Sequence, residues 1–222
     1  MSRFLNSRRG AALLLAALSP ACIFSQASQP NVHTLAARVD QHYDQLHSLK
    51  AGFVESYAGM GVQRTESGEL LLSKPGKMRW NYTSPEGKIF LLDGKYAWFY
   101  APGDAQVQRI PAKQLDDLRS PLRFLLGHTN LEKELSKLSL APAPNGEFVL
   151  SGVPKGQENR VSRISLTVTA AGAITGIEVE ELDGATTQFK FSGEQPNVPI
   201  AATVFSFKPP SGISVVDGPP PV

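Results

Sequence analysis

The sequence predicts a mainly β protein: one continuous, curved antiparallel sheet whose concave face is covered by short helices. Near the N-terminus, apolar residues recur at helical spacing, and after them the apolar period changes to two, which is typical of strands. Short turns containing Gly, Pro and Asp separate the strands, and strands joined by such turns run antiparallel. Helical spacing returns once, near the middle. The helical segments need an apolar surface to cover, and the concave face of the sheet is the large one on offer.

The first 27 residues have the pattern of a secretory signal peptide. Three arginines precede the apolar run 11–18, and small residues follow it. We expect cleavage after Ala27, with a cut after Ala21 as the alternative. The run is too short to span a bilayer. Cleavage after Ala27 leaves 19 basic and 20 acidic residues, so the mature chain lacks the basic face that nucleic-acid binding requires.

Cys22 is the only cysteine, and it lies inside the signal segment. If the chain is cut after Ala27, the mature protein folds without disulfides in an oxidising compartment. Acylation of Cys22 is the alternative, although Leu18 stands one position too early for a lipoprotein signal. We expect one domain over residues 28–217 and a disordered, Pro-rich tail over residues 218–222.

From Asn31 to Leu49 the apolar residues form one stripe, which predicts an amphipathic helix. Six strands are then expected, with Asp93-Gly94 as the clearest hairpin turn among them. Their ranges are Ala51–Tyr57, Gly68–Leu72, Met78–Thr83, Ile89–Leu92, Tyr96–Tyr100 and Ala105–Ile110.

Helical spacing interrupts the strand pattern between Lys113 and Leu138. Pro121 can begin a second short helix that Gly127 ends, and Asn130 can cap a further helical turn that runs through Leu131 and Leu135. Strands are expected again at Glu147–Leu150, Arg160–Thr169, Ala173–Glu181, Thr186–Ser192 and Thr203–Phe207.

The sequence shows no pattern of catalytic or metal-binding residues, so we predict a protein that is not an enzyme and that holds no metal or cofactor. The four histidines lack ligand spacing, and no nucleophile elbow, phosphate-binding loop or dinucleotide motif occurs. The adjacent acids Glu180 and Glu181 would point to opposite faces of a strand. Asp116 and Asp117 fit a solvated helix face.

Aromatic residues are concentrated in the strands between Met78 and Tyr100. By alternation Met78, Trp80 and Tyr82 share one face, and so do Trp98 and Tyr100 on a later strand. Such a set can be an ordinary packed core. If the helical cover can be displaced, it can equally line a cavity for an apolar ligand.

The run LLLSKPGKMRWNYTSPEGKIFLLDGKYAWFYAPGDAQVQ, Leu70 to Gln108, resembles the central signature of the LolA family of periplasmic outer-membrane lipoprotein carriers. Leu49–Glu55 resembles the family's strand after the first helix, and Phe205–Pro210 resembles its terminal F-x-F-x-P-P segment. The likeness extends from about Leu35 to Asp217.

The resemblance implies an incomplete antiparallel β-barrel of roughly 11 strands, a half-barrel whose open hydrophobic side is closed by a lid of short helices. It implies a monomeric periplasmic chaperone that shields the acyl chains of triacylated lipoproteins. Its expected partners are an inner-membrane ABC lipoprotein-releasing complex and an outer-membrane acceptor lipoprotein. An acylated acceptor or a periplasmic lipoprotein sensor of the same fold is the alternative. A lipid hydrolase is a rival of another class, for which the sequence shows no nucleophile–base pair.

The candidate acyl-chain residues are Phe53, Leu70, Leu72, Met78, Trp80, Tyr82, Phe90, Leu92, Trp98, Tyr100, Phe189 and Phe191. The candidate lid residues are Leu35, Val39, Leu46, Leu118, Leu122 and Leu125.

Two positions depart from the family pattern. Lys74 stands where the family's basic–Pro turn carries Arg, and a lysine offers no bidentate geometry for holding the lid shut. We therefore expect Lys74 to latch the lid weakly, or Arg79 to share that role. A solvated turn lysine is the alternative for Lys74. Glu55 stands where the family usually has Gln.

Overall fold

The computed structural model describes residues 30–117, 123–127 and 130–218. The predicted signal peptide and most of the predicted tail lie outside these residues, as do the lid candidates Leu118 and Leu122. Within them, α1 spans Val32–Gln45, and the Asn31 side chain caps it by accepting a 2.8 Å hydrogen bond from the amide of Thr34. The helix ends earlier than predicted, because Leu46 already has extended backbone dihedrals. Leu49 belongs to the first strand, where its side chain still faces the core.

The first six strands form the predicted meander. They are β1 Ser48–Gly59, β2 Val62–Ser73, β3 Lys77–Ser84, β4 Glu86–Asp93, β5 Tyr96–Tyr100 and β6 Gln106–Pro111. Three short helices follow, α2 Ala112–Asp117, α3 Arg123–Leu126 and α4 Leu131–Glu134. The second series is β7 Leu135–Pro142, η1 Pro144–Gly146, β8 Phe148–Pro154, β9 Val161–Val168, β10 Ile174–Glu181, β11 Thr186–Pro196, η2 Ala202–Phe205 and β12 Ser214–Asp217.

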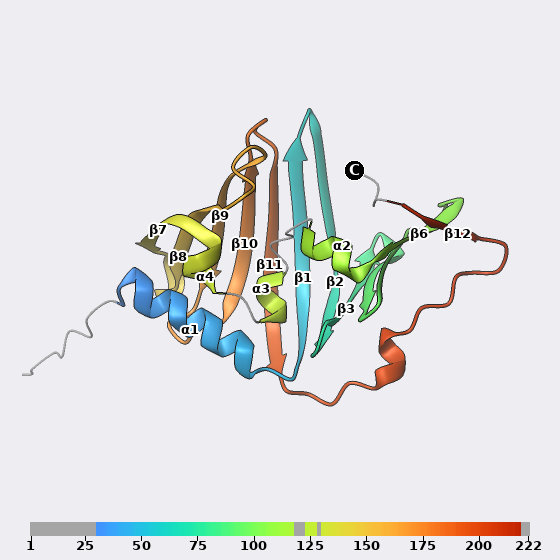
Figure 1. Cartoon of the computed structure of the whole chain (residues 1–222), viewed down its shortest axis with the longest axis horizontal. Helices are drawn as coiled ribbons and strands as arrows, with labels where there is room; N and C mark the ends of the chain where they lie inside the picture. The colour runs from blue at the N-terminus through green and yellow to red at the C-terminus, as the bar shows by residue number, and fades with distance from the viewer. Residues whose placement is uncertain (1–29, 118–122, 128–129, 219–222) are drawn as a thin grey trace, which may run out of the picture.

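All twelve strands belong to one sheet, in the order β12-β6-β5-β4-β3-β2-β1-β11-β10-β9-β8-β7. The antiparallel pairing of β1 with β11 joins the two series of strands. The sheet curves without closing, and the helices lie in front of it in Figure 1. The predicted curved sheet with a helical cover is therefore confirmed.

Two segments were predicted with the wrong type, and one strand was missed. Leu135 begins strand β7, not the end of a helical turn, because α4 stops at Glu134. The predicted strand Thr203–Phe207 is largely the 3-10 helix η2, which packs against the sheet without joining it. Strand β12 was not predicted. It pairs parallel to β6, and such pairing between distant segments leaves no local turn signal.

Apolar side chains pack on both faces of strands β2, β4 and β5. The larger cluster lies between the concave face and helices α1, α3 and α4. A smaller cluster on the opposite face joins Leu71 and Leu91 to Phe205 of η2. This explains why the segments 70–72 and 89–92 are apolar without alternation: successive side chains point to opposite faces, and both faces are covered.

Gly172 lets the turn between β9 and β10 approach α1 closely. Its φ is +96°, and a Cβ atom there would lie 2.5 Å from the carbonyl oxygen of Arg38. We expect Gly172→Ala to lower the free energy of unfolding by more than the ~1–3 kcal/mol of a strained left-handed residue, because it also pushes α1 away from the sheet.

The matched control is Gly184→Ala. Gly184 has a φ of +87° in the next hairpin turn, and a Cβ atom there would have no other atom within 4 Å. Urea unfolding measures the free energy of unfolding of both variants, and the difference between them gives the contribution of the close approach to α1. Equal losses of stability would show that the close approach contributes nothing.

Candidate functional site

The candidate site is the apolar concave face of the sheet. Strand register places Leu70, Trp80, Phe90 and Phe99 opposite one another on β2, β3, β4 and β5, and all four belong to one apolar cluster. The Trp80 side chain lies at its centre and is only 1% exposed. The predicted residues Phe53, Leu72, Met78, Tyr82, Leu92, Phe189 and Phe191 belong to the same cluster.

Aromatic rings surround Trp80 on this face. The ring centroid of Phe53 lies 4.5 Å from that of Trp80, and those of Phe189 and Phe191 lie at 5.5 and 6.1 Å. All three pairs meet edge to face, the arrangement that aromatic quadrupoles favour. Residues from β1 and β3 thus form one aromatic group with residues of β11, which lie more than a hundred positions later in the sequence.

Trp98 and Tyr100 do not belong to this group, so the prediction that they line the acyl-chain face was wrong. Both side chains lie on the opposite face of β5, where their ring centroids are 5.8 and 6.1 Å from that of Phe207. Phe99, which was not predicted, occupies the concave face. Alternation shows which residues of a strand share a face. It could not show which face is concave, since both faces of β5 are apolar.

The described lid residues belong to the same apolar cluster as the aromatic group. Leu35 and Val39 of α1 and Leu125 of α3 are at most 2% exposed and belong to the cluster that contains Trp80. Leu46, just after α1, belongs to it as well. Phe124, which was not among the predicted lid residues, does the same from α3. Trp80 is 1% exposed within this cluster, so a ligand could reach it only if part of the cluster moved.

Lys74 contacts the C-terminal end of α1. Its ammonium group donates a hydrogen bond to the carbonyl oxygen of Tyr43, in the last turn of α1, which also accepts from the backbone amide of Leu46 at 3.3 Å. A Cβ atom on Gly127, just after α3, would lie 2.5 Å from the Lys74 Nζ atom. Burial lowers the pKa of Lys74, and the nearby Asp44 carboxylate opposes that shift. Lys74 therefore lies where α1, α3 and the β2–β3 turn meet.

Arg79 does not lie at the lid, which corrects the second latch candidate. Its guanidinium Nη1 donates to the carbonyl oxygens of Val204, at 2.9 Å, and Ser206, at 3.4 Å. Its Nε donates to Asn81 Oδ1 at 2.6 Å. Arg79 therefore holds η2 against the face opposite the helices. Because side chains alternate along a strand, a residue next to Trp80 had to point away from the lid.

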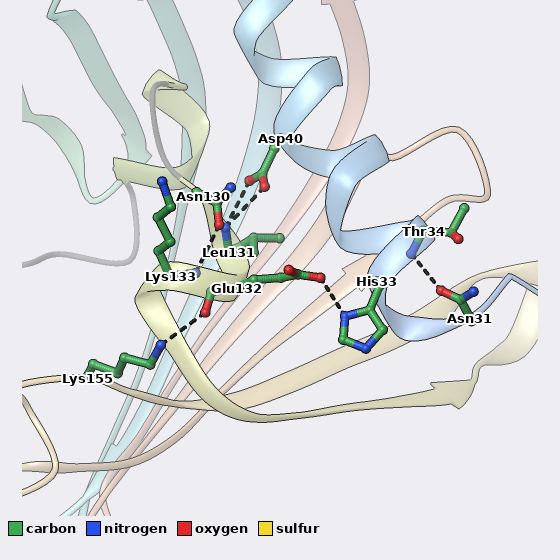
Figure 2. A network of polar contacts seen from close by, with 9 residues as sticks. All are labelled: Asn31, His33, Thr34, Asp40, Asn130, Leu131, Glu132, Lys133 and Lys155. Carbon is green, nitrogen blue, oxygen red and sulfur yellow. Dashed lines mark hydrogen bonds and ion pairs between the residues drawn. The ribbon is translucent and has the colours of Figure 1, made fainter.

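Figure 2 shows how α1 is connected to α4. Both carboxylate oxygens of Asp40 accept from the backbone amide of Leu131, at 3.2 Å. At the start of α1, His33 Nδ1 lies 2.6 Å from Glu132 Oε1. Burial raises the pKa of Asp40 to about 6, with the Leu131 hydrogen bond opposing the shift and the nearby carboxylates of Asp44 and Glu132 adding to it.

Two further polar contacts hold α1 against the sheet. The Tyr43 hydroxyl oxygen accepts from the backbone amide of Ile174 at 3.0 Å. The His42 Nε2 atom lies 2.9 Å from Glu194 Oε1. The Tyr43–Ile174 bond lies inside the apolar cluster, whereas the contacts of Asp40 and His42 are only partly buried. Sequence spacing gave no sign of these contacts because each joins residues more than 80 positions apart.

A polar cluster lies on the concave face at the end of β3 opposite Met78. The Tyr82 hydroxyl donates to Glu55 Oε2 at 3.0 Å, and the Lys88 ammonium group donates to Glu66. Arg64 Nε lies 3.4 Å from Glu66 Oε1. Burial raises the pKa values of both Glu55 and Tyr82. The concave face is therefore apolar around Trp80 and charged beyond Tyr82.

Within the described residues, no helix has the length and apolar character needed to cross a bilayer. In the same part of the chain, His, Cys, Asp and Glu side chains form no group of three or more that could hold a metal ion.

Comparison with known proteins agrees with this geometry. The family model described as outer membrane lipoprotein carrier protein LolA matches residues 44–208. An outer-membrane lipoprotein carrier protein of Nitrosospira multiformis is 31% identical over 157 residues, covering 70% of this chain and 74% of its own. One from Chromobacterium violaceum is 29% identical over 201 residues, covering 90% and 96%. A conserved protein from Thermus thermophilus, 13% identical, has a similar fold with a TM-score of 0.54, covering 83% of this chain and 97% of its own.

Asp40 gives the α1–α4 contact a pH dependence. Because its folded pKa of about 6 lies above the ordinary value of 3.8, its contribution to stability is fully present below pH 3.8 and is lost as the pH rises through 6. We expect Asp40→Asn to raise the melting temperature above pH 7, since an amide oxygen can still accept from Leu131 without a buried charge. Below pH 4 the two proteins should melt at similar temperatures.

Asp183→Asn is the control for this series, because Asp183 also accepts from a backbone amide, that of Ala185, at 2.9 Å, but lies in a distant turn. Thermal unfolding of all three proteins is measured from about pH 3 to about pH 8, which spans the two pKa values of Asp40. A larger loss of stability for Asp40→Asn at pH 7.5 than at pH 4.5 would contradict the assignment.

Proposed function

The chain belongs to the LolA family of outer membrane lipoprotein carrier proteins, and from this we propose that it carries lipoproteins through the periplasm with their acyl chains against the concave face. The observation that carries the proposal is the apolar surface around Trp80, which spans strands of both meanders and to which, among the described residues, helices α1, α3 and α4 add their apolar side chains. The function includes no catalytic step.

The need for such a cover follows from the hydrophobic effect. At ~0.8 kcal/mol per buried methylene, one long acyl chain exposed to water costs on the order of 10 kcal/mol, and three chains cost several times as much. A carrier must therefore exclude water from the chains. It must also release them into a membrane, so its own affinity for the chains has to stay below that of a bilayer.

Displacement of the lid helices would allow the protein both to exclude water from the acyl chains and to release them. When α1 and α3 move outward, acyl chains take the place of side chains such as Leu35, Val39 and Leu125 on the sheet. The helices lose buried apolar area when they leave the sheet, and the ligand buries apolar area in their place. The net free energy gained on binding is therefore smaller than it would be in a pocket that is already open. The polar contact of α1 that lies inside the apolar cluster comes from the uncharged Tyr43 hydroxyl, so breaking it leaves no charge there.

The finer roles are part of the same proposal. We infer that the signal peptide over residues 1–27 directs export, and that the mature chain acts as a monomer. It would accept triacylated lipoproteins from an inner-membrane ABC complex and deliver them to an outer-membrane acceptor lipoprotein. Residues of the concave face from Phe53 to Phe191 would hold the chains, with Lys74 as the latch.

The proposal is tested by expressing the chain with its own signal in a Gram-negative host. The periplasmic protein is purified without detergent and the bound material is identified by mass spectrometry. We expect a water-soluble complex with acylated lipoproteins and a mature N-terminus that begins after residue 27. An acylated Cys22 would instead identify an acceptor lipoprotein, and lipoproteins that stay in the membrane in a reconstituted release assay would overturn the carrier role.

Lys74→Leu tests the latch. Because the variant removes the hydrogen bond to Tyr43 and its partly buried charge, we expect faster amide hydrogen exchange in the last turn of α1. We also expect faster uptake of the apolar dye bis-ANS, and altered loading or release of lipoprotein. Lys77→Leu is the control, as it removes the same charge from the same turn at the start of β3. If loading and release both stay normal in Lys74→Leu, Lys74 is no latch.

A further inference from the structure

Trp80 carries a buried hydrogen-bond donor that has no acceptor. Among the described residues, the indole Nε1 of Trp80 and the side-chain oxygen Oε1 of Gln108 are the buried side-chain polar atoms without a hydrogen-bond partner. Such atoms are rare in folded proteins, because a buried donor or acceptor loses its hydrogen bonds to water and gains nothing in return. Each one therefore requires an explanation.

Both atoms belong to the same row of residues on the concave face. Trp80 is opposite Phe90 in the β3–β4 pairing, Phe90 is opposite Phe99, and Phe99 is opposite Gln108 on β6. Residues that are directly opposite across strands share a face of the sheet. The unpartnered polar atoms are thus concentrated on the surface that the proposed function assigns to the ligand.

The second tryptophan of the chain shows that the fold can satisfy an indole. The Trp98 Nε1 atom, on the opposite face, donates to Asp93 Oδ2 at 2.7 Å. Around Trp80, by contrast, the neighbours are the rings of Phe53, Phe189 and Phe191. A phenylalanine at position 80 would provide an aromatic surface without an unpaired donor.

We propose that the Trp80 indole N–H donates a hydrogen bond to a carbonyl oxygen of the ester or amide linkages that join acyl chains to the cargo. This inference rests on the proposed carrier function and names the chemical group that the site recognises. A hydrocarbon tail offers no acceptor to the indole, and an ether oxygen is a weaker acceptor than a carbonyl. The site is therefore selective for acyl linkages and not only for apolar chains.

The position of Trp80 along β3 suits a group at the root of an acyl chain. Tyr82, two residues further on and ~7 Å along the strand, begins the polar cluster with Glu55. In the other direction Met78 leads towards Lys74 and the end of α1. A lipid with its carbonyl at Trp80 would place its polar glyceryl and peptide part at the Glu55–Tyr82 end, with its tails in the apolar region under the helices.

Two synthetic lipopeptides test the proposal. One carries two palmitoyl ester chains on a glyceryl-cysteine peptide, and the other is its dihexadecyl ether analogue, with the same peptide and chains of the same length. Displacement of bis-ANS measures their affinities for the full-length mature protein. We expect the ester lipopeptide to bind roughly tenfold more tightly, the effect of one hydrogen bond to a buried donor.

Trp80→Phe should abolish the preference, so that the ester and ether lipopeptides bind alike, whatever the smaller ring does to both affinities. Trp98→Phe is the matched control. It removes the same indole group from the opposite face and should keep the preference. An undiminished preference in Trp80→Phe would overturn the proposal.

Nuclear magnetic resonance of the wild-type protein gives a second readout that does not depend on the folding of Trp80→Phe. The chain has two tryptophans, so its spectrum holds two indole N–H signals, and Trp98→Phe assigns them. We expect the Trp80 indole proton to shift downfield with the ester lipopeptide and not with the ether.

Failure of the carbonyl contact and failure of the carrier function give different results. If wild type binds both lipopeptides equally and the indole signal responds alike, the carbonyl contact is absent while the carrier function stands. If neither lipopeptide displaces the dye, the carrier function itself fails.

Discussion

The constraint on which the rest of this structure depends is that a curved sheet of twelve strands does not close. A closed barrel hides its interior by pairing its edges, whereas this sheet ends at β12 and β7 and leaves its concave apolar face to be covered by other elements. Among the described residues, α1, α3 and α4 take part in that cover, and Ala112 at the start of α2 packs against the same cluster. Short helices have little stability of their own, so they remain in place through packing on Trp80 and its neighbours. A cover held by packing can be exchanged for another apolar partner.

The smaller cluster on the convex face explains how the sheet can survive such an exchange. Leu71 and Leu91 pack there against Phe205, and Arg79 holds the same segment through the carbonyl oxygens of Val204 and Ser206. These contacts involve none of the lid helices. Strands β2 to β5 therefore keep one packed face when the other is opened, and the aromatic row stays in position while its cover changes.

Much of the fold could be predicted from the sequence because its signals are local. Alternation and turn residues such as Asp93-Gly94 placed most strands within a few residues, and the spacing of Leu35, Val39 and Tyr43 placed α1. The errors arose where the local signals were weak or ambiguous. β12 is defined only by β6, and β7 by β8. Trp98 was assigned to the wrong side because both sides of β5 are apolar. The contact of Lys74 with Tyr43 was expected from family resemblance, whereas the contact of Asp40 with Leu131 depends on how α4 approaches α1.

The distribution of polar groups follows from the requirement that binding be reversible. A concave face without any polar atom would hold every apolar molecule in proportion to its area and would discriminate little between cargo and other lipids. A face with charged groups at its centre could not cover acyl chains at all, because burying an unpaired charge costs far more than a chain gains. This chain lies between these limits: Glu55 and Glu66 have hydrogen-bond partners at one end of the face, and the uncharged Trp80 indole is a donor without a partner among the apolar side chains. An uncharged donor can be left unpaired at a cost that the fold tolerates, and it regains that energy only when a carbonyl arrives. Selectivity is thereby obtained from a group that adds little to the affinity for plain hydrocarbon, which leaves the cargo free to pass on to a membrane.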